Sequence, residues 1–143
     1  MALTLPPDPT QVLAASRHWA VLLNADQTLL GRCFLLLLRP ETDVAALTGD
    51  EVADLWALTR RVRAALDALW SPDHYNYAFL MNVDPQVHFH LIPRYQSPRV
   101  FAGATFTDPA FGGHYALGPE RPLDADTAEA LRARLRETTA TTQ

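Results

Sequence analysis

The most informative stretch of the chain reads Gln86-Val87-His88-Phe89-His90-Leu91-Ile92. Polar and apolar residues alternate along it, which is the pattern of a β-strand with one buried face. Since successive side chains of a strand point to opposite sides of a sheet, the polar set shares one side and the apolar set the other. The pattern therefore predicts a strand over residues 86–92 that carries Gln86, His88 and His90 together on one face.

Two histidines at this spacing can act on one phosphate group. One imidazole attacks the phosphorus, while the other holds an oxygen or protonates the departing group. The same pair can instead bind zinc if a third ligand comes from elsewhere in the chain, and the candidates are Asp84, His74 and His18. The spacing by itself leaves the phosphate and the metal interpretations open.

The neighbouring sequence predicts more strands. Apolar runs at residues 19–23 and 31–38 flank a polar, turn-forming stretch at residues 24–28, which predicts an antiparallel hairpin. Residues 75–81 are rich in aromatic side chains and predict another strand. The Asp84-Pro85 turn then joins that strand to residues 86–92, so these two strands are expected to pair as a second hairpin.

Two helices are predicted before the histidine strand. Asp8 offers an N-cap and Pro9 the first helical position, so a short helix is expected over residues 9–16. Thr48-Gly49-Asp50-Glu51 has the spacing of a capping box, and apolar residues then recur every three or four positions. This pattern predicts the longest helix of the chain, which ends near Trp70 because Ser71-Pro72 stops it.

The last third of the chain has a weaker signal. Residues 96–123 are punctuated by glycine and proline without clear periodicity, which predicts an irregular loop region with one short strand near Val100. A final helix is expected over residues 124–137, and residues 138–143 are expected to be frayed. The whole pattern is typical of a single α+β domain over residues 1–143.

Composition narrows the classes of function. The chain has 143 residues, of which 48% are hydrophobic and 20% charged, as in a globular domain. The net charge is −4 and the 12 basic residues are all arginines, which argues against a nucleic-acid-binding surface. The apolar run at residues 33–38 is far shorter than the ~20 residues that span a bilayer. Cys33 is the single cysteine, so we expect a reducing, cytoplasmic setting without membrane association.

The segment at residues 82–95 resembles the signature of the histidine-triad (HIT) family, with histidines that alternate with hydrophobic residues and an Ile-Pro-Arg sequence after them. Upstream, Asn24, Gly31, Arg39-Pro40 and residues 47–55 are similar to the branch that contains the fragile-histidine-triad dinucleoside polyphosphate hydrolases. The resemblance covers roughly residues 18–95. It implies a HIT-like fold with a five-stranded antiparallel sheet, a homodimer, and nucleotidyl transfer through a histidine intermediate.

The resemblance also implies roles for individual residues. In the family the middle histidine is the nucleophile, and His88 occupies that position. His90 matches the third histidine, which supports the phosphate and the leaving group. Asn24 matches the asparagine that binds the ribose hydroxyls, and Asn82 resembles a position near the phosphates. Gln86 stands where the family has its first histidine, and its amide can donate and accept hydrogen bonds but cannot carry a titratable proton.

Arginine is the only strong cationic phosphate partner in a chain without lysine, and Arg94 and Arg99 follow the histidine strand. Both are therefore candidates for phosphate binding. No cofactor is required by the histidine chemistry, although a divalent cation such as magnesium could accompany a polyphosphate substrate.

Three hypotheses follow for the function. The first is a nucleotide hydrolase or nucleotidyl transferase that cleaves a phosphoanhydride or phosphoramidate bond, for example in a diadenosine polyphosphate, through a His88-nucleotide intermediate. The second is a nucleotide-binding module that has lost catalysis, as Gln86 suggests. The third is a zinc-binding protein that uses His88 and His90.

Overall fold

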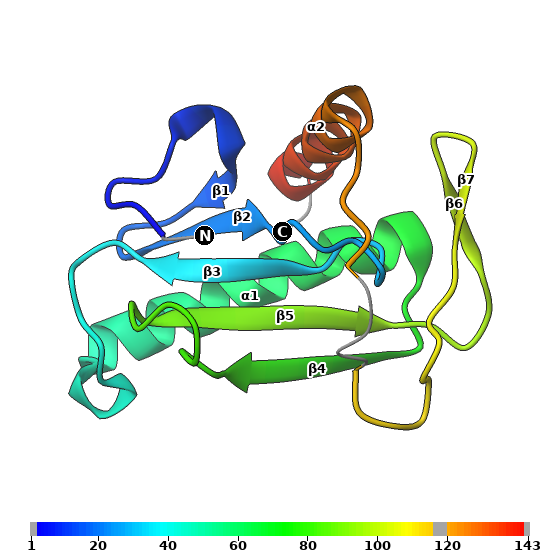
Figure 1. The fold of residues 1–143 in the computed structure, drawn as a ribbon. Helices are drawn as coiled ribbons and strands as arrows, with labels where there is room; N and C mark the ends of the chain where they lie inside the picture. The colour runs from blue at the N-terminus through cyan, green and yellow to red at the C-terminus, as the bar shows by residue number, and fades with distance from the viewer. Residues whose placement is uncertain (1–2, 116–119, 142–143) are drawn as a thin grey trace.

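The computed structural model describes residues 3–115 and 120–141 (Figure 1). A five-stranded antiparallel sheet, in the order β1-β2-β3-β5-β4, has the long helix α1 along one face. The elements in chain order are η1 (Pro9–Gln11), β1 (Val12–Ala15), β2 (Trp19–Leu23), β3 (Cys33–Leu37), η2 (Val44–Ala46), α1 (Gly49–Trp70), β4 (His74–Phe79), β5 (His88–Arg94), β6 (Arg99–Phe101), β7 (Ala104–Phe106) and α2 (Ala125–Thr141). The α+β class and the five-stranded antiparallel sheet predicted from the sequence are confirmed.

Both predicted hairpins form. Strands β2 and β3 pair in register from Trp19 opposite Leu37 to Leu23 opposite Cys33. All of β4 pairs with β5, from His74 opposite Arg94 to Phe79 opposite Phe89, and β5 also pairs with β3, so the histidine strand has a neighbour on each side. All seven residues of β5 are buried.

Helix α1 begins at the predicted capping box. The side chain of Thr48 accepts a hydrogen bond from the backbone N–H of Glu51, and the Glu51 carboxylate accepts one from the backbone N–H of Thr48. The helix ends at Trp70, before Ser71 adopts a left-handed conformation with φ 46°. Apolar side chains of α1 pack in one core with those of β5 and of the preceding residue, so this core lies between the helix and one face of the sheet. The residues concerned are Leu55, Leu58, Val62, Leu66, Trp70, Val87, Phe89 and Leu91.

The helix predicted over residues 9–16 is wrong. Asp8 does act as an N-cap, but the helical turn is a three-residue 3-10 helix, and the chain then enters β1. Strand β1 pairs with β2, with Ala15 opposite Ala20. Hydrogen bonds to a neighbouring strand and burial of Leu13 outweigh the local helix signal here.

The region predicted as irregular also holds more structure than expected. The single strand predicted near Val100 is one arm of a hairpin between β6 and β7. Its turn is made by Ala102 and Gly103, both with positive φ, 51° and 76°. Such a pair of residues fits the turn type that two-residue hairpins favour.

The C-terminal helix is longer than predicted. Helix α2 reaches Thr141, and Thr139 is buried in its last turn, so the expected fraying from residue 138 does not occur up to residue 141. Residues 142 and 143 lie outside the described residues. Leu131 and Leu135 form the buried side of the helix, as the periodicity predicts.

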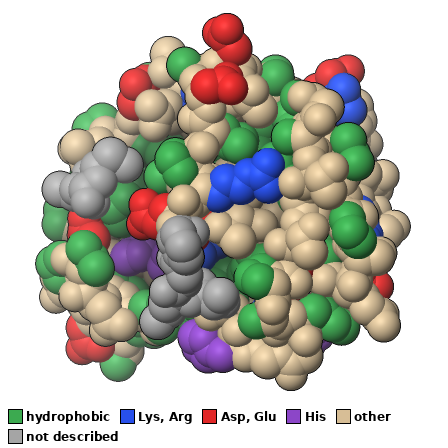
Figure 2. All heavy atoms as spheres, turned by 45° about the vertical axis from the view of Figure 1, so that its right-hand side comes forward, with side chains coloured by type: hydrophobic (Ala, Val, Ile, Leu, Met, Phe, Trp, Pro, Cys, Tyr) green, Lys and Arg blue, Asp and Glu red, His purple; other side chains and the backbone are tan. Residues whose placement is uncertain are grey.

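The surface has a mixed character. On the face drawn in Figure 2, arginine side chains lie among apolar and acidic ones, and histidine side chains reach the surface at two places, one of them next to acidic side chains. In the described part of the chain, no helix combines the length and the apolar character needed to cross a bilayer.

Gly31 allows the turn into β3 to lie against α1, and replacing it is expected to destabilise the fold. It has φ +89°, and a Cβ atom there would lie 2.7 Å from Cδ2 of Leu66 and 3.3 Å from the ring of Trp70. We expect Gly31→Ala to lower the free energy of unfolding by about 1–2 kcal/mol through backbone strain and by a further ~1–3 kcal/mol through overpacking.

Gly112→Ala is the matched control, because Gly112 has φ +91° but no heavy atom within 4 Å of the added Cβ. Urea unfolding of both variants would measure the difference. Equal destabilisation by the two substitutions would contradict the close contact between Gly31 and α1.

Candidate functional site

Strand β5 presents the two histidines together, because its side chains alternate between the faces of the sheet. Phe89 and Leu91 point into the core beneath α1, while His88 and His90 lie on the opposite face with their ring centroids 4.8 Å apart. Gln86 precedes β5 and is not part of it, since the strand begins two residues later than predicted. The two histidines therefore lie on one face of the sheet, and the side chains that pack in the core lie on the other.

His88 is held in one tautomer by the backbone. Its Nδ1 atom lies 2.7 Å from the carbonyl oxygen of Gln86, and a carbonyl can only accept a hydrogen bond. Nδ1 therefore carries the proton, and the lone pair is on Nε2. Phe34 of β3 packs edge-on against the ring at 5.8 Å. An imidazole fixed in this way has the nucleophilic nitrogen turned away from its support.

The side chain of Gln86 links β5 to the segment that follows β3. Its Nε2 donates to the carbonyl oxygens of Leu37 and Arg39, at 3.1 and 2.7 Å, and its Oε1 accepts from the backbone N–H of Glu41 at 3.2 Å. Three side-chain hydrogen bonds therefore fix the residue whose own carbonyl orients His88. A neutral imidazole has one donor and one acceptor, so it could not reproduce all three.

His90 is neutral at neutral pH. Burial, and secondarily the charges of His88 and Arg32, lower its pKa to about 4. Only 9% of the residue is exposed, and its Nδ1 has no hydrogen-bond partner in the described part of the chain. A neutral imidazole can still donate one hydrogen bond to a phosphate oxygen or to a leaving group.

Arg94, a predicted phosphate-binding candidate, is occupied by protein groups. It is 2% exposed and forms an ion pair with Asp108 at 2.7 Å. Its guanidinium also donates to the side chain of Asn76 and to the carbonyl oxygens of Gly113 and Ala110. Arg94 thus ties the segment after β7 to the sheet, and the interpretation of this residue as a phosphate ligand is wrong.

Arg99 is engaged as well, because its guanidinium donates to the carbonyl oxygens of Trp70, Ser71 and Ser97. The arginine that the sequence analysis missed is Arg32, immediately before β3. It shares the face of the histidines, since Phe34, two residues further on, lies opposite His90. A charged residue at the start of an otherwise apolar run was the signal available in the sequence.

The two predicted asparagines lie in different surroundings. Asn24 follows β2, and its backbone N–H donates to the carbonyl of Arg32, so it is a neighbour of that residue on the sheet. Its Oδ1 accepts from the backbone N–H of Asp26, which is a local turn bond. Asn82 is exposed in the connection between β4 and β5 and makes no hydrogen bond to a described residue.

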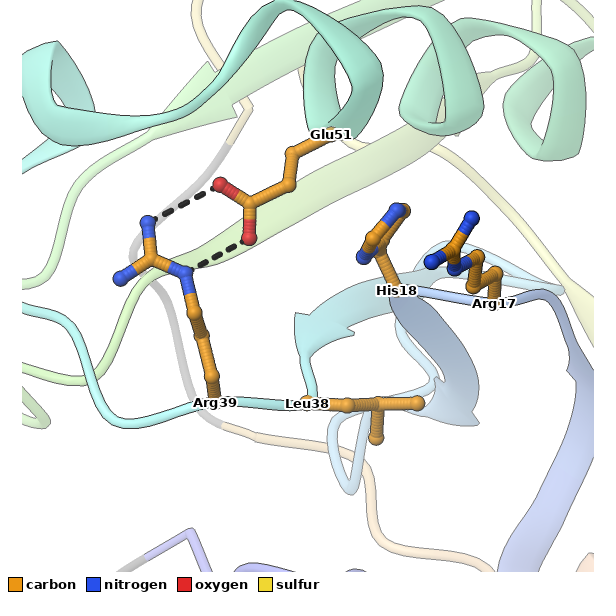
Figure 3. Close-up of a pocket in the computed structure, with 5 residues that line it drawn as sticks. All are labelled: Arg17, His18, Leu38, Arg39 and Glu51. Atoms are coloured by element: carbon orange, nitrogen blue, oxygen red, sulfur yellow. Dashed lines mark hydrogen bonds and ion pairs between the residues drawn. The ribbon is translucent and has the colours of Figure 1, made fainter.

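Two cavities of the described surface lie away from the histidine pair. A cavity of about 490 Å³ lies beside the start of β4 and is lined by Asp73, His74, Asn76, Arg94, Phe111, Gly112 and Gly113. A smaller one of about 150 Å³ is lined by Arg17, His18, Leu38, Arg39 and Glu51 (Figure 3). In the smaller cavity Arg39, which follows β3, is paired at 2.7 Å with Glu51 in the first turn of α1. We place the candidate site at His88 and His90 on chemical grounds.

A metal site at the histidine pair lacks a third protein ligand. Within residues 3–115 and 120–141, no group of three or more His, Cys, Asp or Glu side chains is placed to hold a metal ion. Asp84 accepts from the backbone N–H groups of Leu3 and Gln86, and His74 lies opposite Arg94 at the far end of the β4–β5 pair. Among the described residues, neither Asp84 nor His74 thus forms a metal-binding group with the histidine pair.

Solved structures of histidine triad proteins have a similar fold. A histidine triad protein from Marinobacter aquaeolei VT8 matches with a TM-score of 0.74 and 25% identity, over 92% of this chain and 90% of that one. A histidine triad (HIT) protein from Sinorhizobium meliloti 1021 has a TM-score of 0.73 and 22% identity, over 89% and 87% of the two chains. A hypothetical histidine triad nucleotide-binding protein from Sulfolobus tokodaii strain 7 has a TM-score of 0.69 and 14% identity, over 91% and 83%.

The sequence comparison points to the same family. No curated protein sequence matches the chain significantly. The sequence model of the HIT domain, however, matches residues 7–97, which include the sheet, α1 and the histidine strand. With the fold, the co-facial histidines and this match in agreement, the chain belongs to the HIT domain family.

Proposed function

We propose that this protein is a nucleotide hydrolase or nucleotidyl transferase, and that it cleaves a phosphoanhydride or phosphoramidate bond through a covalent His88-nucleotide intermediate. The observation that carries the proposal is the hydrogen bond from Nδ1 of His88 to the carbonyl of Gln86, at 2.7 Å. It leaves Nε2 as an unprotonated nucleophile without the need for a neighbouring base. Membership of the HIT family, whose members are commonly nucleotide hydrolases or transferases, supports the same reaction class.

The reaction proceeds in two displacements at one phosphorus. The lone pair of His88 Nε2 attacks, the N–P bond forms, and the bond from phosphorus to the leaving group breaks. The electron pair of that bond goes to the departing oxygen, or to a departing nitrogen that takes up a proton from solvent and leaves as an amine. Water then attacks the same phosphorus and loses a proton to solvent. The N–P bond breaks, Nε2 regains its lone pair, and the nucleotide leaves as a monophosphate.

His90 and Gln86 have different tasks in this scheme. With its proton on Nε2, neutral His90 donates a hydrogen bond to the transferred phosphate or to the leaving group. Gln86 does not exchange protons, and it positions His88 through its backbone carbonyl while its side chain holds the segment after β3. Gln86 therefore affects the orientation of the nucleophile more than the proton balance of the reaction.

The finer assignments are proposals from family resemblance. Asn24 would contact the ribose and Asn82 the phosphates, and the substrate would be a dinucleoside polyphosphate, as in the fragile-histidine-triad branch. No resident cofactor is proposed, and a magnesium ion would enter only as part of a polyphosphate substrate. A cytoplasmic location is proposed on the basis of Cys33, whose thiol is buried with its pKa raised to about 12 and is thus protected as a free cysteine.

Removal of the nucleophile tests the reaction directly. We expect His88→Ala to lower kcat for hydrolysis of diadenosine polyphosphates by about 10³-fold or more, because the covalent route is lost. The measurement is nucleotide release followed by chromatography. Turnover equal to that of the wild type would show that His88 is not the nucleophile.

A catalytically inactive nucleotide-binding module is the second candidate, and the presence of glutamine at position 86 favours it. If glutamine has abolished catalysis by replacing a histidine, Gln86→His should raise hydrolysis. In our account the same change removes hydrogen bonds to the segment after β3 and leaves buried groups unpaired. We expect it to lower the free energy of unfolding by about 1–3 kcal/mol and not to increase kcat.

Gln86→Glu is the matched variant, because it retains the shape and the acceptor but turns a carboxylate oxygen toward the carbonyls of Leu37 and Arg39. Unfolding in urea and the hydrolysis assay would be measured on both variants. A gain in kcat for Gln86→His would favour the inactive-module interpretation over ours.

The homodimer is also a proposal, and an exposed aromatic patch supports it. Strand β4 is an edge of the sheet. Beside it, Trp56 of α1 and Tyr77 of β4 both pack on Phe89, at 5.5 and 6.0 Å between ring centroids, yet remain 40% and 42% exposed. An exposed edge strand next to exposed aromatic rings is a surface that a second copy of the chain could cover.

Light scattering after size-exclusion chromatography tests this proposal. We expect the wild type to have the mass of a dimer and Trp56→Glu the mass of a monomer, since a carboxylate would be buried at the interface. Val100→Glu is the control, because Val100 is 64% exposed on β6, away from β4. A monomeric wild type, or dissociation by the control variant, would contradict the placement of the interface.

A further inference from the structure

Arg32 lies on the same face of the sheet as the histidine pair. It immediately precedes β3, where Phe34 is opposite His90 and Cys33 is opposite Leu91. Because side chains alternate, Arg32 and Phe34 are on the face of His90. Arg32 and Phe34 are two residues apart, so their Cα atoms are separated by about 6.6 Å. The charge of Arg32 also contributes, after burial and His88, to the lowered pKa of His90.

The guanidinium of Arg32 is mostly buried, and none of its nitrogens donates a hydrogen bond to an oxygen of the described residues. Its side chain is 12% exposed, and its Nε is fully buried without a hydrogen-bond partner among the described residues. Its contacts are an ion pair with Asp26, at 3.7 Å between Nη1 and Oδ2, and the ring of Tyr115, whose centroid is 5.5 Å from Cζ. Neither contact is a hydrogen bond at these distances.

Asp26 is committed to other partners. Its Oδ1 accepts hydrogen bonds from the backbone N–H and the hydroxyl of Thr28 and from the backbone N–H of Arg121. These bonds hold the carboxylate in place, so that it remains beside Arg32 at ion-pair distance.

Arg94, which lies on β5 on the same face as His88 and His90, differs from Arg32. Every nitrogen of its guanidinium donates to a protein oxygen, as expected for a buried structural arginine. Arg32 is a mostly buried arginine whose Nε donates to no oxygen of the described residues, and guanidinium donors match the oxygens of a phosphate group. Since His90 is neutral, the permanent positive charge beside the histidine pair comes from Arg32.

We propose that Arg32 binds oxygen atoms of the phosphate next to the one that His88 attacks, so that the substrates are nucleosides with at least two linked phosphates. This inference rests on the proposed function, because it places the attacked phosphate at His88. It favours phosphoanhydrides over phosphoramidates of a nucleoside monophosphate, which have a single phosphate. In the reaction, Arg32 stabilises the negative charge that develops on the leaving phosphate when the P–O bond breaks.

Calorimetric titration with ADP and with AMP tests the proposal. All variants would be made in a His88→Ala background, in which no turnover is expected. We expect Arg32→Gln to weaken ADP binding by about 10- to 100-fold, which is the loss of hydrogen bonds to a charged group. AMP, which has no second phosphate, should lose less than about 3-fold because it makes no such contact. Arg32→Lys keeps the charge but not the fork of donors, and it should give an intermediate loss.

Arg63→Gln is the matched control. Arg63 also stacks on a tyrosine, with its Cζ 4.6 Å from the ring centroid of Tyr75, and pairs with an aspartate at 3.9 Å, but it lies on α1. It should change neither affinity. Thermal unfolding of each variant checks that the fold is retained, and if Arg32→Gln does not fold, the comparison of ADP with AMP in Arg32→Lys decides the question.

The outcomes separate this proposal from the proposed function. Unchanged ADP affinity in the Arg32 variants, or an equal loss for ADP and AMP, would overturn the role of Arg32 even if His88 proves to be the nucleophile. A selective loss of ADP affinity would support the phosphate contact even if the His88→Ala variant turned over substrate as fast as the wild type, in which case only the proposed chemistry would fail.

Discussion

The alternation of side chains along β5 is the constraint on which the rest of the structure depends. The strand is buried and paired on both edges, with β3 on one side and β4 on the other. Its odd-numbered residues fill the core beneath α1, so its even-numbered residues must face the other way. A shift of one residue in register would bury both histidines beneath α1 and expose Phe89 and Leu91. The packing that stabilises the domain therefore also determines where the chemistry lies.

The immediate surroundings of the histidines are electrostatically unusual. Gln86 cannot titrate and His90 remains neutral with its pKa lowered to about 4. Neither residue can bring a permanent positive charge to an anionic substrate. In the described part of the site this charge is supplied by Arg32, which is partly balanced by Asp26. Arg32, immediately before β3, and the proposed nucleophile His88 on β5 thus belong to neighbouring segments of one sheet.

Much of the fold could be predicted from the sequence because it is encoded locally. The capping box at Thr48, the turn between β2 and β3, and the alternation along β5 each lie within a few residues, and the structure confirms all three elements. Strand β1 could not be predicted because Asp8 and Pro9 favour a helical turn. The residues that follow form a strand because they pair with β2, and this pairing is not encoded locally.

The candidate site was predictable to a similar extent. The position of His88 and His90 on one face follows from the alternation, and the match to the HIT domain confirms the family that the sequence resembles. The roles of the arginines did not follow, because they depend on contacts far apart in the chain. Arg94 is occupied through Asp108, and Arg32 becomes a neighbour of His90 only when β3 pairs with β5.

The central claim is that the nucleotide becomes covalently attached to His88, and trapping the adduct tests it most directly. Protein mixed with excess diadenosine polyphosphate would be quenched rapidly under alkaline conditions, in which a phosphoramidate bond survives, and its intact mass and peptides would be measured. We predict one added nucleotidyl group on the peptide that contains β5, located at His88. An active enzyme with no adduct at any quench time, or with the adduct on another residue, would contradict the account.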